Sequence, residues 1–106
     1  ETVDTSTAGI PPAAASDLTA TGATGSATIE WRNPNSSNFS YAKVWRNTSA
    51  DFGTAADASG ALPGGLGQVQ EFVDTVGAGS YWYWVVAYNA ANIASPETGP
   101  ATATVT

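Results

Sequence analysis

The stretch S-Y-W-Y-W-V-V-A-Y-N, residues Ser80 to Asn89, decides the fold. It contains neither Gly nor Pro and is dense in the aromatic and β-branched residues that favour strands. Because side chains alternate between the two faces of a strand, the odd-numbered residues share one face and the even-numbered residues share the other. The first face carries Tyr81, Tyr83, Val85 and Ala87, and the second carries Trp82, Trp84, Val86 and Tyr88. We expect one face in the core and the other at the surface or against a partner, because 106 residues cannot bury both.

Composition excludes several classes of partner. The chain has a net charge of -6 and only three basic residues, Arg32, Lys43 and Arg46. These are too few to form the phosphate-neutralising patch that nucleic acid requires, and an anionic membrane surface is disfavoured for the same reason. No run approaches the ~20 apolar residues of a membrane span. We therefore predict no nucleic-acid partner and no membrane insertion.

Catalytic chemistry is poorly represented. The chain has no Cys, His or Met, so the common nucleophile–base pairs and zinc sites cannot be assembled. The acidic residues fall in different turns of a domain too small for a glycosidase cleft, and the loop from Asp51 to Asp57 lacks the ligand spacing of a calcium site. We predict a protein that is not an enzyme, with no catalytic residues, no metal and no cofactor.

Two parts of the chain differ in composition. The Thr-, Ala- and Pro-rich opening predicts an interdomain tether over residues 1–10, and the folded domain is predicted over residues 11–106. The first residue is Glu rather than Met, so we expect a piece of a longer protein.

Strand signals recur along the domain, separated by turn residues. The expected strands are Asp17–Thr21, Ala27–Arg32, Phe39–Asn47, Gln68–Thr75, Ser80–Asn89 and Thr98–Thr106. Between Thr48 and Gln70 we expect either a short extra edge strand near Phe52 or a mobile excursion, and residues 55–61 are compatible with a helical turn. About seven short strands without a convincing helix predict an all-β fold, an antiparallel Ig-like β-sandwich.

Alternation also predicts the core. Ile29 and Trp31 share a face, and we place Val44 inward because the opposite register would bury Lys43 without a partner. The predicted core residues are Leu18, Ile29, Trp31, Val44, Phe72, Tyr81, Tyr83, Val85 and Ala87.

Over residues 11–106 the chain resembles a fibronectin type III domain. I-E-W-R-N-P at residues 29–34 resembles the second strand of that fold, and G-S-Y-W-Y-W-V-V-A-Y-N at residues 79–89 resembles the sixth. The resemblance implies a seven-stranded sandwich in which the Tyr81 hydroxyl bonds back to the upstream backbone. It departs from the family where Asn92 or Ile93 replaces the usual turn glycine.

A narrower resemblance joins V-W-R-N-T at residues 44–48, F-G-T-A-A at 52–56, F-V-D-T at 72–75 and S-Y-W-Y-W-V at 80–85. This run is similar to the fibronectin-like domains of phage tail-tip, host-specificity and tail-fibre proteins. It implies a non-catalytic spacer or adhesin-arm module in a virion tail, with neighbouring domains or subunits as partners. The alternative is an accessory module of a secreted, extracellular bacterial carbohydrate-active enzyme, with cell-surface carbohydrate as a further partner.

The outward aromatic residues form the candidate contact surface. The third and sixth strands are neighbours in this fold, so six side chains are expected to share one sheet face: Tyr41, Lys43, Trp45, Trp82, Trp84 and Tyr88. Such a surface could meet a sugar or a neighbouring domain. The alternative is cross-strand aromatic packing, with a lysine or a flanking Arg32 or Arg46 laid over a ring.

Two loop features complete the predictions. The glycine-rich segment from Gly60 to Gly67 has no G-K-[ST] and is interpreted as a flexible edge connection or a partner-contacting loop. Asp74, in D-T, is interpreted as capping a turn through its side chain.

Overall fold

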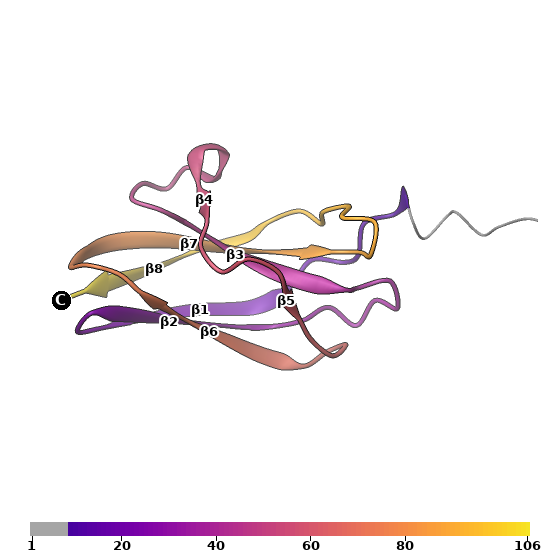
Figure 1. Cartoon of the computed structure of the whole chain (residues 1–106), viewed down its shortest axis with the longest axis horizontal. Coiled ribbons are helices and arrows are strands. Elements are labelled where there is room, and N and C mark those ends of the chain that lie inside the picture. The colour runs from indigo at the N-terminus through magenta and orange to yellow at the C-terminus, as the bar shows by residue number, and fades with distance from the viewer. Residues whose placement is uncertain (1–8) are drawn as a thin grey trace, which may run out of the picture.

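The computed structural model describes residues 9–106, and most of the predicted tether therefore lies outside the described residues. Two sheets pack face to face (Figure 1). The first has the strand order β1-β2-β6, and the second has the order β4-β3-β7-β8, with β5 also paired to β3. The elements are β1 (Ser16–Ala23), β2 (Ser26–Arg32), β3 (Tyr41–Asn47), the 3-10 helix η1 (Phe52–Thr54), β4 (Ala56–Asp57), β5 (Leu62–Pro63), β6 (Val69–Thr75), β7 (Gly79–Tyr88) and β8 (Thr98–Val105). The predicted antiparallel β-sandwich is confirmed, with eight strands in place of seven within the described residues.

The long strands follow the alternation of the sequence. β3 and β7 pair antiparallel over seven residues, from Tyr41 opposite Tyr88 to Asn47 opposite Trp82. β2 ends at Arg32, before Asn33 and Pro34, because proline cannot donate to the next position of the ladder. β1 and β2 are joined by a tight turn in which Gly25 has a φ of 75°, a left-handed conformation that glycine adopts without strain.

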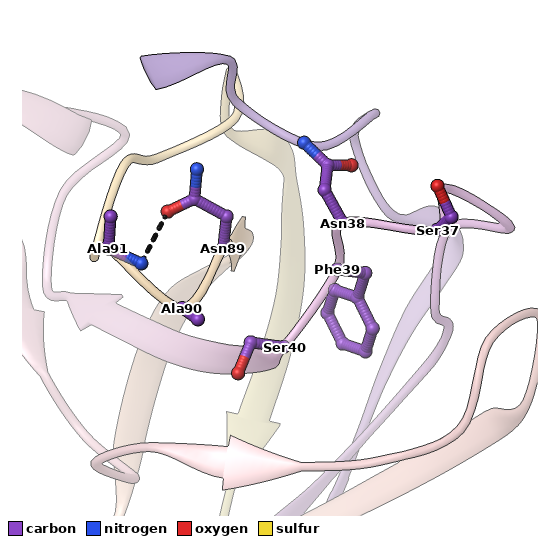
Figure 2. Close-up of a pocket in the computed structure, with 7 residues that line it drawn as sticks. All are labelled: Ser37, Asn38, Phe39, Ser40, Asn89, Ala90 and Ala91. Atoms are coloured by element: carbon purple, nitrogen blue, oxygen red, sulfur yellow. Dashed lines mark hydrogen bonds between the residues drawn. The ribbon is translucent and has the colours of Figure 1, made fainter. Parts of the chain in front are cut away.

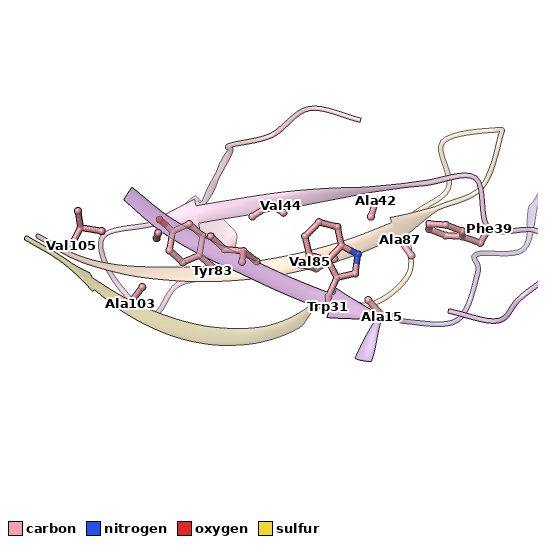
Figure 3. Close-up of a cluster of buried hydrophobic side chains, with 12 residues drawn as sticks. Ala15, Trp31, Phe39, Ala42, Val44, Tyr83, Val85, Ala87, Ala103 and Val105 are labelled. Atoms are coloured by element: carbon pink, nitrogen blue, oxygen red, sulfur yellow. The ribbon is translucent and has the colours of Figure 1, made fainter. Parts of the chain in front are cut away.

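The core lies between the two sheets (Figure 3). Ile29 and Trp31 enter it from β2, and Ala42 and Val44 enter it from β3, so Lys43 faces outward. Of the predicted core residues, six are fully enclosed: Ile29, Trp31, Val44, Tyr83, Val85 and Ala87. The other three, Leu18, Phe72 and Tyr81, are partly buried and pack against that cluster.

The segment between β3 and β6 matches its prediction in part. The short extra edge strand expected near Phe52 is β4, which pairs with β3 and occupies part of the stretch expected to form a helical turn. Phe52 itself begins the 3-10 helix η1. The cause is local hydrogen bonding by Asp51, whose side chain accepts bonds from the Gly53 N–H and the Thr54 hydroxyl. Asp51 therefore caps the turn, as its short carboxylate is suited to do.

The glycine-rich segment is pinned to the core. The Trp31 indole Nε1 donates to Asn33 Oδ1 at 2.8 Å, and Asn33 Nδ2 donates to the Gly65 carbonyl at 3.0 Å and to Gln70 Oε1 at 2.6 Å. Gln70 Nε2 in turn donates to the Pro63 carbonyl. The edge connection is therefore tied to the core at Pro63 and Gly65, because the buried Asn33 amide needs such partners.

β1 and β8, which belong to different sheets, are joined at one end. The Gly25 N–H donates to the Thr106 carbonyl, and the Thr106 N–H donates to the Ala23 carbonyl, so the end of β1 is joined to the end of β8. A Cβ atom at Gly22 would lie 1.8 Å from the Thr104 carbonyl oxygen. The approach of the two backbones therefore requires glycine at this position.

The connections that flank β7 have the geometry that the family resemblance implied. The Tyr81 hydroxyl donates to the Gly77 carbonyl at 2.9 Å, which makes the upstream backbone contact. Asn92 has a φ of 66° and takes the left-handed position where glycine is usual, as asparagine does more readily than other residues. No helix among residues 9–106 is long and apolar enough to cross a bilayer.

Candidate functional site

The outer face of the β3–β7 pair brings the six predicted contact residues together. Tyr41 lies opposite Tyr88, Trp45 lies opposite Trp84, and Trp82 lies opposite Asn47. Lys43 stands between the two aromatic pairs on the same face. The register of β3 against β7 therefore places these side chains in one band.

Tyr41 and Tyr88 form one end of this band. Their rings are stacked, with centroids 4.9 Å apart and planes 9° from parallel. The Tyr41 hydroxyl also donates to Asn92 Oδ1 at 2.6 Å, which ties the pair to the loop after β7. Burial raises the pKa of Tyr88, against the opposing effects of the Trp45 indole N–H and the Lys43 ammonium. Because the two rings stack on each other, one face of each ring is covered by the other.

Lys43 fills the space between Tyr88 and Trp45. Its Nζ lies 5.4 Å from the Tyr88 ring centroid and 5.8 Å from the Trp45 ring centroid, which is cation–π distance. The Asp57 carboxylate, on β4, lies 3.5 Å from the same ammonium. The chain's own lysine thus occupies the ring faces that a sugar would stack on.

Phe52 covers the middle of the band. Its ring meets Trp45 edge-on at 5.9 Å between centroids and tilts against Trp84 at 5.6 Å. Trp84 is only 2% exposed, and so is Val86. The expectation that the whole even-numbered face of β7 is open to solvent or a partner is corrected for these two residues, and Phe52 of η1 is one of the groups that cover Trp84. Sequence reasoning missed Phe52 as a cover, although the capping residue Asp51 directly precedes it.

Trp82 is placed differently from the other aromatic residues of the band. It is half-buried, and its ring enters none of the ring or cation contacts found among the described residues. Its neighbours in register are Asn47 on β3 and Thr102 on β8. Trp82 is therefore the aromatic member of the predicted contact surface whose ring has no aromatic or cationic partner in the described part of the chain.

A cluster of three polar side chains, Arg46, Asp74 and Tyr83, lies between the two sheets. Arg46 was expected to flank the aromatic band, but it faces inward and its Nη1 donates to both Asp74 oxygens at 2.8 Å. The Tyr83 hydroxyl donates to Asp74 Oδ2, also at 2.8 Å. Asp74 is 5% exposed, so its interpretation as a turn cap is corrected to an ion pair between the two sheets. Burial, followed by the bond to Asp74, strongly raises the pKa of Tyr83.

A pocket of about 500 Å³ opens at the pole where the described chain begins (Figure 2). It lies between the loop before β3 and the loop after β7, and its lining residues carry no charge. The side-chain amides of Asn38 and Asn89 both donate to the Ile10 carbonyl at 2.9 Å. Sequence reasoning missed this pocket, because it is made by two loops that are distant along the chain.

The described residues do not gather the groups that metal binding needs. Within residues 9–106 no three acidic, His or Cys side chains lie close enough together to hold a metal ion. Ser37 and Ser40 place hydroxyl groups at the pocket shown in Figure 2, but no basic side chain is among the residues that line it.

Solved structures with this fold are fibronectin type III domains. An Fn3-like protein from Clostridium thermocellum matches with a TM-score of 0.69 at 16% identity, over 92% of this chain and 96% of that one. The FN1–FN3 domains of chicken CNTN1 match at 0.66 and 19% identity, over 92% of this chain and 35% of that one.

A β-1,2-glucanase from Parabacteroides distasonis matches with a TM-score of 0.70 at 18% identity, over 91% of this chain but 14% of that one. No protein-family model and no curated protein sequence matches the chain. At these identities the likeness shows the fold, a fibronectin type III β-sandwich.

Proposed function

We propose that this fibronectin type III fold serves as a non-catalytic spacer or adhesin-arm module of a phage-type tail-tip or tail-fibre protein. Its partners are neighbouring domains or subunits of the same assembly, and its location is the virion tail. The tail setting is supported by the sequence resemblance of residues 44–48, 52–56, 72–75 and 80–85.

The observation that carries the spacer role is the position of the two ends of the described chain. The described chain begins at one end of the sandwich, and its C-terminus lies at the opposite end (Figure 1). A module of this kind adds its own length to a string of domains. Domains in such strings meet through limited contacts at their ends.

The closed aromatic face supports the same role. Phe52 and Lys43 occupy most of the ring surface that a ligand would use, which leaves a self-contained sheet. The Arg46–Asp74 pair and the β1–β8 contact join the two sheets at separate places. These links favour a stiff element over a deformable binding site.

Domain replacement tests the spacer role. In the full-length protein, residues 11–106 are either deleted or exchanged for an unrelated fibronectin type III domain of similar length. A spacer is replaceable, so the exchange is expected to retain particle assembly and host attachment while the deletion loses them. If the exchange loses attachment as completely as the deletion, the module carries a binding site of its own and the spacer role is wrong.

A second candidate is an accessory module of a secreted bacterial carbohydrate-active enzyme. It is favoured by Trp82, whose half-buried ring has no aromatic or cationic partner among the described residues. It is also favoured by the Parabacteroides glucanase, in which the matching region is a small part of a longer chain. Tryptophan fluorescence during titration with soluble polysaccharides tests it. A saturable change that is lost in Trp82→Ala and kept in Trp45→Phe supports sugar contact, whereas a flat response contradicts it.

A further inference from the structure

The outer edge of β6 is a free strand edge. β6 pairs with β2 on one side over all seven residues without a register shift, and no other strand pairs with it in the described part of the chain. In Figure 1 it runs along the lower margin of the sandwich. An unpaired edge of this kind presents backbone donors and acceptors to another chain.

Hydrogen bonds at the two ends of β6 show which residues point outward. The Asn33 N–H donates to the Gln68 carbonyl, and the Val76 N–H donates to the Gly25 carbonyl. Because bonded and non-bonded positions alternate along an antiparallel ladder, the even-numbered residues of β6 bond to β2. The backbone groups of Val69, Glu71 and Val73 therefore face the free edge.

The side chains of these same residues form an apolar–acidic–apolar row. Val69 and Val73 are 47% and 52% exposed, which is high for valines on a strand. Between them, Glu71 lies directly opposite Glu30 of β2. Neither carboxylate has an ion pair or hydrogen bond among the described residues, since the nearby Arg32 is engaged by Asp17 at 3.5 Å and by the Gly67 carbonyl at 2.8 Å.

The other strand edges are short or irregular. β1 and β8 are joined at one end by the bonds around Thr106, and the ladders that β1 and β8 form within their own sheets each contain a register shift. β4 and β5 contain two residues each. β6 contains no proline, no bulge and no lysine, which are three of the usual means of blocking an edge. Its two charged residues are Glu71, on the outer face, and Asp74, whose inward charge is paired with Arg46. β6 is therefore the long, regular edge left open in this part of the molecule.

We propose that the β6 edge binds an extended segment of another protein as an added strand, with a Lys or Arg opposite Glu71 and branched apolar residues opposite Val69 and Val73. Strand addition supplies affinity through main-chain bonds, and the alternate side chains supply specificity. A cation at the central position reduces the electrostatic repulsion between the Glu30 and Glu71 carboxylates. The net charge of -6 attracts a basic segment over a longer range. This site is separate from the proposed spacer role and does not depend on it.

The probe is a capped heptapeptide, acetyl-Ser-Val-Thr-Lys-Thr-Val-Ser-amide. Its sequence reads the same in both directions, so a parallel or an antiparallel strand presents Lys to Glu71. Titration into the 15N-labelled chain is expected to shift the amide resonances of Val69, Glu71 and Val73 in a saturable way and to slow their hydrogen exchange. Replacement of Lys by Glu in the peptide is expected to weaken binding about five-fold or more, since an attractive cross-strand charge pair becomes repulsive.

Variants of the chain make the test specific. Val73→Pro removes an outward N–H that the fold does not use, so the chain is expected to remain folded and to lose the peptide. Val73→Lys is compared with Ala50→Lys, an equal charge change on an exposed loop of the other sheet, and only Val73→Lys is expected to reduce binding at matched salt. Glu71→Lys is expected to exchange the preference, binding the Glu peptide better than the Lys peptide.

Four results would overturn the proposal. The first is the absence of saturable shifts up to millimolar peptide, and the second is equal binding of the Lys and Glu peptides. The third is shifts centred on β8 or on the Asn89–Ala91 loop. Concentration-dependent dimerisation that protects β6 without peptide would assign the edge to a second copy of this chain and would likewise contradict the proposed partner.

Discussion

The Tyr83 hydroxyl donates a 2.8 Å hydrogen bond to Asp74 Oδ2, and this bond joins β7 of one sheet to β6 of the other inside the sandwich. The same carboxylate receives both bonds from Arg46 on β3. Asp74 therefore comes from one sheet, and the two side chains that bind it, Arg46 and Tyr83, come from the other. Removing one member of a buried charge pair is costly, because the remaining charge loses its partner.

Loss of the Asp74 carboxylate should destabilise the domain strongly. Asp74→Ala leaves the Arg46 guanidinium half-buried without its anion and the Tyr83 hydroxyl without its acceptor, so we expect a loss of roughly 2–4 kcal/mol in the free energy of unfolding. Tyr83→Phe removes one charge-assisted bond and is expected to lose about 1–2 kcal/mol. Urea denaturation followed by tryptophan fluorescence measures both. Equal, small effects would show that the network contributes little.

Alkaline pH should destabilise the fold through Tyr83. Burial and the bond to Asp74 raise the pKa of Tyr83 in the folded chain above its ordinary value of about 10. The neutral form is therefore favoured in the folded state, its contribution is complete below about pH 10, and stability falls as pH rises above that value. The midpoint of urea unfolding, measured between pH 8 and 11, should decline for the wild type and decline less for Tyr83→Phe. The decline that remains in the variant should include the contribution of Tyr88. A decline of the same size in both proteins would exclude Tyr83 as the cause.

A methyl group at Gly22 should separate β1 from β8. The added Cβ would meet the Thr104 backbone carbonyl at 1.8 Å, and a backbone atom cannot move aside as a side chain can. We expect Gly22→Ala to lower the free energy of unfolding by about 1–3 kcal/mol, as overpacking does. Gly77→Ala, where nothing lies within 4 Å of the added atom, serves as the control and should be close to neutral. Comparable losses in both variants would indicate a general effect of glycine replacement.

Phe52 should control the exposure of the aromatic face. Phe52→Ala removes the ring that lies against Trp45 and Trp84, and we expect increased acrylamide quenching of tryptophan fluorescence. The loss of a half-buried aromatic side chain should also lower stability by about 1–3 kcal/mol. Phe52→Leu keeps an apolar cover and is expected to restore most of the protection. Unchanged quenching in Phe52→Ala would mean that other residues exclude the quencher.

Charge reversal at Glu71 should stabilise the chain. Like charges directly opposite each other on neighbouring strands are unfavourable, so Glu71→Lys is expected to gain roughly 0.2–1 kcal/mol by facing Glu30. The gain should shrink as salt is raised, because both groups are exposed. It should also disappear when Glu30→Gln is present, which a double-mutant cycle measures. A gain that persists without Glu30 would point to net charge as its source.

Local alternation carried most of the fold prediction. The period of two in Ala27–Arg32 and Ser80–Asn89 placed Ile29, Trp31 and Val85 on inward faces, because a pleated strand has no other way to orient consecutive side chains. The inward choice of Val44 followed from the cost of burying Lys43. Strand bounds were predictable where Gly or Pro ends the pattern.

Contacts between distant segments were harder to predict. The sequences around Arg46 and Asp74 resemble those around many exposed charged residues. Nothing in the local sequence therefore shows that these two residues meet across the two sheets. The packing of Phe52 on Trp45 and Trp84 was also missed, since a single aromatic residue in a Gly- and Ala-rich loop does not reveal which surface it covers. The anchoring of Gly65 by Asn33 depends on the same kind of long-range approach.

The sequence by itself determined that this chain is a β-sandwich, that β7 lies at its centre, and which side of each long strand faces inward, because these follow from residue spacing and strand geometry. Only the tertiary structure decided that Phe52 and Lys43 cover the outward aromatic residues and that Asp74 pairs with Arg46. It also decided that β6 is the strand whose edge stays open. Those outcomes depend on how loops and sheets meet in space, where small differences in packing select one contact among several that the sequence allows.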